Sequence, residues 1–429
     1  MTFLLLLGGL VLVILTGLPV FAALGLFGGT LMVIDEGSLA ALGEIVFGKL
    51  NIYLLVAIPL FTLMAHFMIR GRIVDDLYGT AHTLLRHLPG GLGVATVAAC
   101  TIFAAISGSS VATALTIGAV AIPQMIRYGY SESTAYGVVG GGGTLGILIP
   151  PSGPMVLFAV VADASIGQLF MAGVVPGLLL ASGFALYCMA TQSLAGERAV
   201  RAEPRAGLRE MLAALRRSFW ALLLPVFVLG GMYLGIFTAT EAAGAGALAA
   251  LLVAMLVYRT LKPLDVWRSA MDAARTSAML FMILAAAAVF SHVLTKMRIP
   301  QGIVALVTGH ELGQIEFLIA VMGLIFVLGM FLETISIILI TTPIVLPVLA
   351  ALAIDPIWYG VLLMVNLELA LITPPVGMNL FTIKAITRGP IEPIIKGVLP
   401  YAAILLGGLV LLLLFPSIAL WLPSTMLGR

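Results

Sequence analysis

Charged residues are scarce in this sequence, because Asp, Glu, Lys and Arg together make up 9% of its 429 residues. A soluble globular protein carries about a quarter, so the scarcity excludes an ordinary soluble domain. The formal net charge of +2 and the lack of a basic patch argue against a nucleic-acid partner. The only two cysteines, Cys100 and Cys188, lie far apart in apolar stretches, and we expect buried thiols there rather than a disulfide or a metal site.

Motifs that would indicate an enzyme are missing as well. The glycine run at 140–144 lacks the lysine and the strand context of a phosphate-binding loop, so we expect no direct use of ATP. No HExxH motif is present, and the serine-rich stretch SGSS at 107–110 has no convincing histidine or lysine in the same layer. We therefore predict that the chain is not an enzyme.

Long hydrophobic runs take the place of these features, and 62% of the residues are hydrophobic. A helix needs about 20 apolar residues to span a bilayer, and the alternating segments of about ten residues that form barrels are absent. We predict an all-α multi-pass membrane protein with a retained first span, because no basic segment precedes the first run. The candidate full spans are 3–34, 50–69, 134–162, 168–194, 219–237, 241–258, 276–294, 358–385 and 398–421.

Two pairs of shorter apolar runs surround small polar stretches. The first pair, 91–126, encloses SGSS, and the second, 315–350, encloses LETIS at 332–336. Such units are typical of re-entrant hairpins, whose tips reach membrane depth only against protein or a water-filled cavity. Two further runs, 134–162 and 358–385, contain Pro-Pro pairs, which an unbroken helix does not tolerate.

These features recur at a constant spacing, which indicates an internal duplication. A shift of 224 positions aligns the two Pro-Pro breaks and the polar residues of the two tips, and a shift of 226 aligns two histidines. The aligned pairs are Pro123 with Pro347, Pro150–Pro151 with Pro374–Pro375, Gly153 with Gly377, Ser110 with Thr334, and His66 with His292.

The distribution of lysine and arginine orients the chain. If each hairpin enters and leaves on one side, all but four of the 21 basic residues share a side, which the positive-inside rule makes cytoplasmic. The amino terminus is then cytoplasmic, the carboxyl terminus is periplasmic, and the two copies have opposite topology. Inverted repeats with matching broken helices point to a secondary transporter with its site near the midplane. The four exceptions are Lys49, Lys296, Arg298 and Arg429.

The duplication also divides the chain into parts. The arginine-rich segment between the repeats is interpreted as a solvated loop with a surface helix that fixes the topology. The parts are an amino-terminal scaffold span (1–49); repeat 1 (50–194, with an arm at 70–90, the hairpin at 91–126 and the broken helix at 134–162); the cytoplasmic arginine-rich loop with connecting scaffold spans (195–275); and repeat 2 (276–421, with an arm at 296–314, the hairpin at 315–350 and the broken helix at 358–385).

Broken helices supply the groups that bind ions. A proline break frees backbone carbonyls, which together with Ser and Thr hydroxyls suit a hard cation, while exposed helix amino termini favour carboxylates. Two acidic residues, Glu333 at the second tip and Glu368 before the second break, lie within the predicted membrane layer. Either glutamate carries a proton or orients a cation site, or it is a structural carboxylate bonded to the hairpin backbone. The sequence leaves both roles open.

One long run carries a family resemblance. The run GGGTLGILIPPSGPMVLFAVVADASIGQLFMAGVVPG, with SGSSVAT before it and NLELALITPPVGMNLF after it, resembles the large membrane subunit of tripartite ATP-independent periplasmic (TRAP) transporters. The resemblance covers essentially the whole chain, and the hairpin plan is more distantly similar to the divalent-anion/sodium symporters.

The resemblance implies a function. Such a subunit, in the bacterial inner membrane, imports an organic anion of the C4-dicarboxylate or sugar-acid class with sodium as coupling ion, no other cofactor, and an elevator movement. A soluble periplasmic binding protein delivers the substrate, and a small four-helix membrane subunit, here expected on a separate chain, braces the scaffold within the lipid. Carried over by motif, sodium site 1 involves Ser107, Ser110, Gly142, Thr144 and Gly146; sodium site 2 involves Thr341, Thr342, Asn366, Thr373 and Gly377; and the substrate lies near Ser109, Pro151, Thr334 and Asn379.

Three alternatives differ in what they predict. A stand-alone divalent-anion/sodium or proton symporter would take up substrate without a binding protein. An intramembrane enzyme using SGSS as nucleophile would keep its sodium binding when Ser107, Ser109 or Ser110 is replaced by alanine. A passive channel is disfavoured by two closed, pseudosymmetric tips.

Overall fold

The computed structural model describes residues 2–73, 75–194 and 203–426, and every regular element in these ranges is helical. Nine helical segments of the described chain are long and apolar enough to cross a membrane. The predicted all-α multi-pass class is therefore confirmed. Both cysteines are free and buried, also as predicted.

The first half of the chain, up to the arginine-rich segment, forms eleven α-helices and one 3-10 turn at Tyr53–Val56. The helices are α1 (Thr2–Leu15), α2 (Val20–Glu36), α3 (Leu42–Leu50), α4 (Ala57–Arg70), α5 (Asp75–Leu85), α6 (Gly91–Ser107), α7 (Ser110–Arg127), α8 (Glu132–Gly143), α9 (Leu145–Leu148), α10 (Gly153–Ala162) and α11 (Ile166–Leu194).

The second half forms ten α-helices, the second of which continues into a π-helical turn at Val253–Val257. They are α12 (Leu208–Tyr233), α13 (Ala239–Leu252), α14 (Pro263–Lys296), α15 (Ile299–Gly309), α16 (Gln314–Gly329), α17 (Thr334–Ala351), α18 (Pro356–Leu371), α19 (Met378–Thr387), α20 (Ile391–Leu414) and α21 (Ser417–Ser424).

One predicted span differs from the structure. The run 3–34 is not a single helix but the two helices α1 and α2, which contact each other. Gly17 takes a left-handed backbone conformation with φ of 88°, and Pro19 caps α2. Proline lacks the backbone donor that a continuous helix would need there, so the chain turns although the whole run is apolar.

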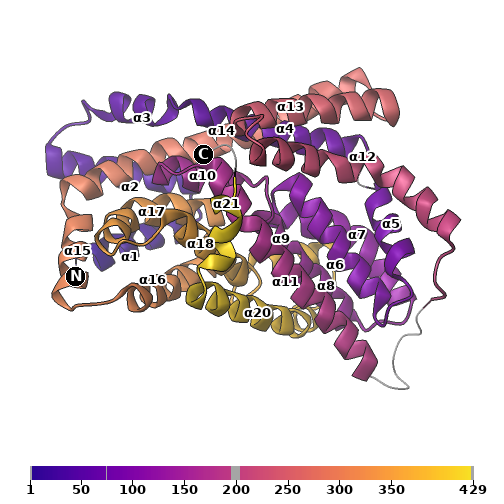
Figure 1. Cartoon of the computed structure of the whole chain (residues 1–429). Coiled ribbons are helices and arrows are strands. Elements are labelled where there is room, and N and C mark those ends of the chain that lie inside the picture. Colours follow the sequence, from indigo (N-terminus) through magenta and orange to yellow (C-terminus); the bar gives the residue numbers. More distant parts are fainter. Residues whose placement is uncertain (1, 74, 195–202, 427–429) are drawn as a thin grey trace.

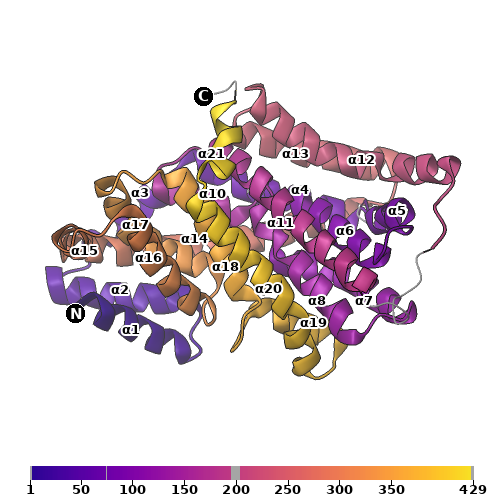
Figure 2. The same ribbon diagram turned by 60° about the horizontal axis from the view of Figure 1, so that its bottom comes forward.

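The helices form two layers (Figure 1). One side of the molecule, which we name the scaffold, consists of α2, α3, α4, α12, α13 and α14. Within it α2, α3 and α4 pack on α14, and α13 packs on α4 and α12. The hairpins and broken helices, α6 to α10 and α16 to α19, lie together with α11 and α20 on the other side, which we name the core (Figures 1 and 2).

The predicted interruptions occur where the prolines are. The first broken helix stops at α9 and resumes at α10, and the second stops at α18 and resumes at α19, so that Pro150–Pro151 and Pro374–Pro375 lie in the gaps. Both peptide bonds within these proline pairs are cis. Helix pairs α6–α7 and α16–α17 occupy the predicted hairpins, with tips at Gly108–Ser109 and at Met330–Glu333.

The arginine-rich segment is only partly described, because residues 195–202 lie outside the described ranges. The predicted surface helix of this segment is the first part of α12, which runs unbroken from Leu208 into the span. Arg86, after the arm helix α5, donates two hydrogen bonds of 2.9 and 3.0 Å to Glu210 and a third of 3.0 Å to the carbonyl of Pro204. The arm of repeat 1 is thus fastened to the start of α12.

Helices α8 and α20 cross at unusually short range. A Cβ placed on Gly397 would lie 2.0 Å from the carbonyl oxygen of Ser133, and one placed on Gly137 would lie 2.1 Å from the carbonyl oxygen of Gly397. Small residues let membrane helices approach this closely. The contact fixes the first broken helix against the carboxyl-terminal part of the core.

Alanine at this crossing should destabilise the protein. We expect Gly397→Ala to lower the free energy of unfolding by about 1–3 kcal/mol, because the new methyl group overlaps backbone that has no room to shift. The measurement is thermal unfolding of the purified chain in detergent. Gly407→Ala on the same helix meets nothing within 4 Å and is the matched control. Equal melting temperatures for the two variants would contradict the close crossing.

Candidate functional site

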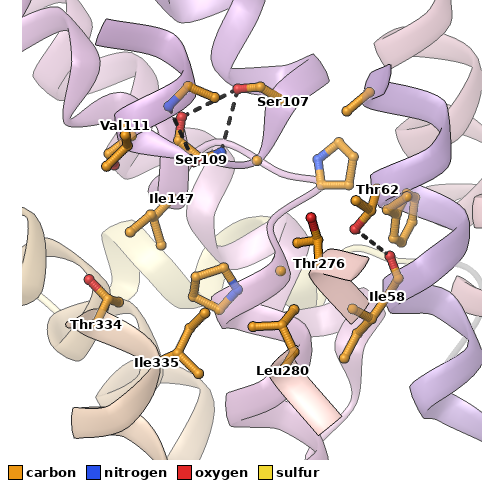
Figure 3. A pocket seen from close by; sticks show the side chains of 18 of the residues that line it. Ile58, Thr62, Ser107, Ser109, Val111, Ile147, Thr276, Leu280, Thr334 and Ile335 are labelled. Atoms are coloured by element: carbon orange, nitrogen blue, oxygen red, sulfur yellow. Dashed lines mark hydrogen bonds between the residues drawn. The ribbon is translucent and has the colours of Figure 1, made fainter. Parts of the chain in front are cut away.

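A cavity of about 360 Å³ lies where the two tips and the two breaks meet (Figure 3). From repeat 1 it is lined by the tip Ile106–Ala112 and by the break around Pro151, and from repeat 2 by the tip at Glu333–Ile335 and by Leu371 and Met378 at the break. Scaffold helices α4 and α14 close the remaining side. The four interrupted segments, far apart in sequence, therefore share one cavity.

Four helix amino termini line this cavity, those of α7, α10, α17 and α19. The side chain of Ser109 caps α7 and that of Ser152 caps α10, whereas no side chain in the described part of the chain caps α17 or α19. Uncapped backbone N–H groups and the positive ends of the helix dipoles favour a bound carboxylate. None of the described residues lining the cavity is a lysine or an arginine.

The first tip packs directly on the first break. Gly108 has φ of 59°, and a Cβ on it would lie 2.4 Å from the carbonyl oxygen of Pro151. A Cβ on Gly146 would lie 2.5 Å from the carbonyl carbon and oxygen of Ser109 and 2.6 Å from the nitrogen of Ser110. The structure thus brings the backbone of Ser109 and Ser110 close to that of Gly146, and the first tip close to Pro151.

The other residues assigned to sodium site 1 have different surroundings. Ser107 lines the cavity and its hydroxyl lies 3.0 Å from that of Thr113. Thr144 is buried and donates a hydrogen bond of 2.5 Å to the carbonyl of Gly141, within its own broken helix. Gly142 faces α6, where a Cβ would lie 2.8 Å from the sulfur of Cys100. Ser107 and Ser110 therefore line the cavity, while Gly142 and Thr144 lie behind it.

Glu368 connects the two repeats. It is buried on α18, and its carboxylate accepts a hydrogen bond from the hydroxyl of Ser110 at the first tip. The backbone N–H of Ile147 on α9 also faces the carboxylate. The second oxygen, Oε2, is buried without a hydrogen bond of normal geometry in the described part of the chain. A carboxylate of repeat 2 thus reaches the proposed ligands of sodium site 1.

The residues assigned to sodium site 2 surround the second break and the helices beside it. Thr341 donates a hydrogen bond of 2.8 Å to the carbonyl of Ile337 in its own helix, and Thr373, in the break, donates one of 2.6 Å back to the carbonyl of Leu369 on α18. Asn366 donates one of 2.9 Å to the carbonyl of Met322 on α16. The hydroxyl of Thr342 is buried and has no partner among the described residues. Gly377 has φ of 57° and its Cβ position lies 3.1 Å from the carbonyl oxygen of Thr373.

Three of the four residues assigned to the substrate line the cavity: Ser109, Pro151 and Thr334. Asn379 does not line it. Asn379 is fully buried in α19, and neither its amide oxygen nor its amide nitrogen has a partner in the described ranges. Glu333 does line the cavity, at the start of α17, where Ser336 donates a hydrogen bond of 3.4 Å to it.

The scaffold contributes polar groups that the sequence did not single out for this site. Thr62 of α4 and Thr276 of α14 line the cavity (Figure 3), and His66 of α4 lines it as well. Thr62 donates a hydrogen bond of 2.8 Å to the carbonyl of Ile58. The sequence did not place His66 at this site. Its match with His292 in the repeat is the signal that could have selected it.

Comparison with known proteins assigns the sequence of this chain to a family. The model of the family described as "Tripartite ATP-independent periplasmic transporter, DctM component" matches residues 7–418. The chain is 41% identical over 403 residues to the C4-dicarboxylate TRAP transporter large permease protein DctM of Pseudomonas aeruginosa, with 94% of each protein covered. It is 36% identical over 417 residues to the isethionate TRAP transporter permease protein DctMQ of Oleidesulfovibrio alaskensis, covering 96% of this chain and 65% of that protein.

Solved structures add a likeness of fold. The crystal structure of the Alcanivorax borkumensis YdaH transporter superposes with a TM-score of 0.66 at 15% sequence identity, covering 96% of this chain and 98% of that one. At that identity the likeness concerns the fold alone. The described part of this chain therefore shares the overall fold of that solved structure.

Proposed function

The chain belongs to the DctM family of tripartite ATP-independent periplasmic transporters, and from this premise we propose that it imports an organic anion together with sodium. It is a multi-pass membrane transport protein and not an enzyme. The finer steps, which are the coupling ion, the substrate, the movement and the partners, form the proposal.

The observation that carries the proposal is the meeting of four helix amino termini in one cavity without a lysine or arginine among its described lining residues. Helix dipoles and N–H groups favour a carboxylate but bring only partial positive charge. Sodium ions bound beside the cavity supply whole charges, so substrate and sodium stabilise each other's binding. We assign the substrate to Ser109, Pro151 and Thr334, and we keep Asn379 as a residue behind the second break.

Sodium site 1 forms where the first tip meets the first break, from Ser107, Ser110, Gly142, Thr144 and Gly146. Glu368 is its counter-charge, because its carboxylate already accepts from Ser110. Sodium site 2 forms from Thr341, Thr342, Asn366, Thr373 and Gly377. The hydroxyl of Thr342 and the amide of Asn379 have no hydrogen-bond partner within the described ranges, and they support a ligand there, since buried polar groups normally find a partner.

The proposed transport movement involves the two layers, scaffold and core. The core carries both hairpins, which we propose to be re-entrant, and it slides against the scaffold as an elevator. We propose the orientation that the basic residues indicate, with the amino terminus in the cytoplasm and the carboxyl terminus in the periplasm. In this orientation the two repeats are inverted, as alternating access by inverted repeats requires.

Two partners complete the transporter. A soluble periplasmic binding protein delivers the anion, and a small membrane subunit stabilises the scaffold. We propose the small subunit as a separate chain, although the relative from Oleidesulfovibrio alaskensis carries DctMQ in its name and extends beyond the matched region. The substrate class we propose first is the C4-dicarboxylates, because the relative from Pseudomonas aeruginosa is named for them.

Replacement of sodium tests the proposal. Proteoliposomes containing this chain and the small subunit, given binding protein loaded with radiolabelled succinate, should take up the label with an inward sodium gradient. With potassium instead, uptake should fall at least about tenfold, because the anion then lacks its co-bound charge. Uptake that is indifferent to the change of cation would refute sodium coupling. Uptake without the binding protein would instead indicate a stand-alone symporter.

A further inference from the structure

A second cavity, of about 470 Å³, lies next to the first. It is lined by α3 and α14 of the scaffold, by α17 of the core, and by Val161 near the end of α10. Helices α10, α14 and α17 line both cavities, and α17 packs against both α10 and α14. The second cavity therefore continues the space between scaffold and core.

The two cavities follow each other along these helices at a regular spacing. On α14 the first cavity ends at Leu280 and the second begins at Leu284, and on α17 the corresponding residues are Ile335 and Leu339. Four residues make about one helical turn, so about one turn of α14 and of α17 separates the cavities. Residue numbers rise from the first cavity to the second on both helices and on α10, which means that the three helices run in the same direction along the path.

Basic side chains are found in the second cavity but not among the tips and breaks. Lys49 of α3 and His292 of α14 both line it. The Nε2 atom of His292 lies 2.8 Å from a carboxylate oxygen of Glu36. Lys49 forms no ion pair within 4.0 Å in the described part of the chain. Burial lowers the pKa of Lys49, and the nearby carboxylate of Asp163 opposes this effect.

The internal repeat relates the two cavities. His66 on α4 lines the first cavity and its repeat counterpart His292 on α14 lines the second. In the proposed orientation the rising residue numbers of α14 lead toward the periplasm, where Lys49 is also placed. Two histidines that correspond in the internal repeat thus line the two neighbouring cavities, one in each cavity.

We propose that the second cavity is the outer end of the anion's path and that Lys49 attracts the anion into it. This inference rests on the proposed function, because it concerns the route to the same site. The ligand class is a small organic anion. The Lys49 ammonium group forms no ion pair within 4.0 Å among the described residues, although the Asp163 carboxylate lies nearby, and it can make the first contact. Electrostatic attraction of this kind raises the local concentration and the rate of entry of an anion.

Charged thiol reagents test the inference without a substrate or a sodium gradient. We replace Cys100 and Cys188 by alanine and introduce Ser291→Cys, since Ser291 lines the second cavity. Membrane-impermeant methanethiosulfonates, one anionic (ethylsulfonate) and one cationic (ethyltrimethylammonium), are then applied to the periplasmic side of right-side-out vesicles. We expect labelling from that side. The ratio of anionic to cationic labelling rates should be higher for Ser291→Cys than for a small thiol free in solution.

The change in this preference decides the role of Lys49. Adding Lys49→Met should lower the ratio of anionic to cationic labelling rates about fivefold, allowing for screening by salt. Lys49→Arg should keep the ratio, and Lys296→Met, which removes an exposed charge outside the cavity, should change it less than Lys49→Met. Elution profile and melting temperature confirm that each variant is folded.

Two outcomes would overturn the inference. One is an unchanged ratio in Lys49→Met, and the other is a folded Ser291→Cys protein that is unlabelled from the periplasmic side. Neither depends on transport, so failure here is distinguishable from failure of the sodium test. If the labelling behaves as expected while uptake ignores sodium, the path stands and the coupling ion is wrong.

Discussion

Glu368→Ala should reduce sodium-driven uptake by about 100-fold, because it leaves the buried hydroxyl of Ser110 without its acceptor and opens a void at sodium site 1. Glu368→Gln should be milder. Glutamine keeps an oxygen that accepts from Ser110 but carries no charge, so the sodium concentration for half-maximal uptake should rise about tenfold or more, while uptake at saturating sodium is partly retained. The measurement is uptake in proteoliposomes over a range of sodium concentrations.

The comparison with glutamine separates the two roles that the sequence leaves open for this residue. A structural carboxylate acts through its hydrogen bonds, and glutamine would then restore a normal sodium dependence. A counter-charge acts through its negative charge, and glutamine would not. Ser110→Ala and the double variant complete a cycle, in which a coupling between the two residues is expected because their side chains are bonded. Sodium dependence equal to that of the wild type in Glu368→Gln would contradict the counter-charge role.

Much of the fold could be predicted because the signals are local. Pro150–Pro151 and Pro374–Pro375 interrupt helices through chemistry that each proline carries with it, and the breaks occur at these positions. Apolar run length predicted most spans for the same reason. The first run shows the limit of this signal, because Gly17 and Pro19 lie inside a stretch whose hydrophobicity alone suggests one helix.

The side-chain partners could not be predicted, because they depend on directions that spacing does not fix. Glu368 and Ser110 are 258 residues apart in sequence, and only the packing of α18 against the first tip and α9 makes them neighbours. Asn379 follows the second break as a substrate ligand would. Its neighbour Met378 lines the cavity, but the side chain of Asn379 is buried elsewhere. His66 lies on the cavity wall because α4 turns this side toward the core, which a position near a span end does not reveal.

Gly146→Ala should abolish sodium binding at site 1. The new methyl group would lie 2.5 Å from the carbonyl carbon and oxygen of Ser109, and these are backbone atoms of the tip, which do not rotate away as a side chain does. The tip must therefore move off the break, at a cost of about 1–3 kcal/mol in the free energy of unfolding. Ion ligands tolerate displacements of only a few tenths of an ångström, about 0.2 Å in well-formed sites.

The measurement is the rise in melting temperature that sodium chloride produces relative to potassium chloride in the purified chain. Gly323→Ala, in the second hairpin, meets nothing within 4 Å and should keep the full sodium-dependent rise. Both variants replace a glycine by alanine, Gly146 in the first broken helix and Gly323 in the second hairpin. They differ in whether backbone atoms of another segment occupy the space that the new methyl group needs. If Gly146→Ala keeps the rise as well, the contact of tip and break is only packing and the first sodium ion binds elsewhere. If the rise becomes smaller in Gly146→Ala alone, while site 2 still binds its ion, the backbone of the first break approaches the tip closely because both hold the first sodium ion.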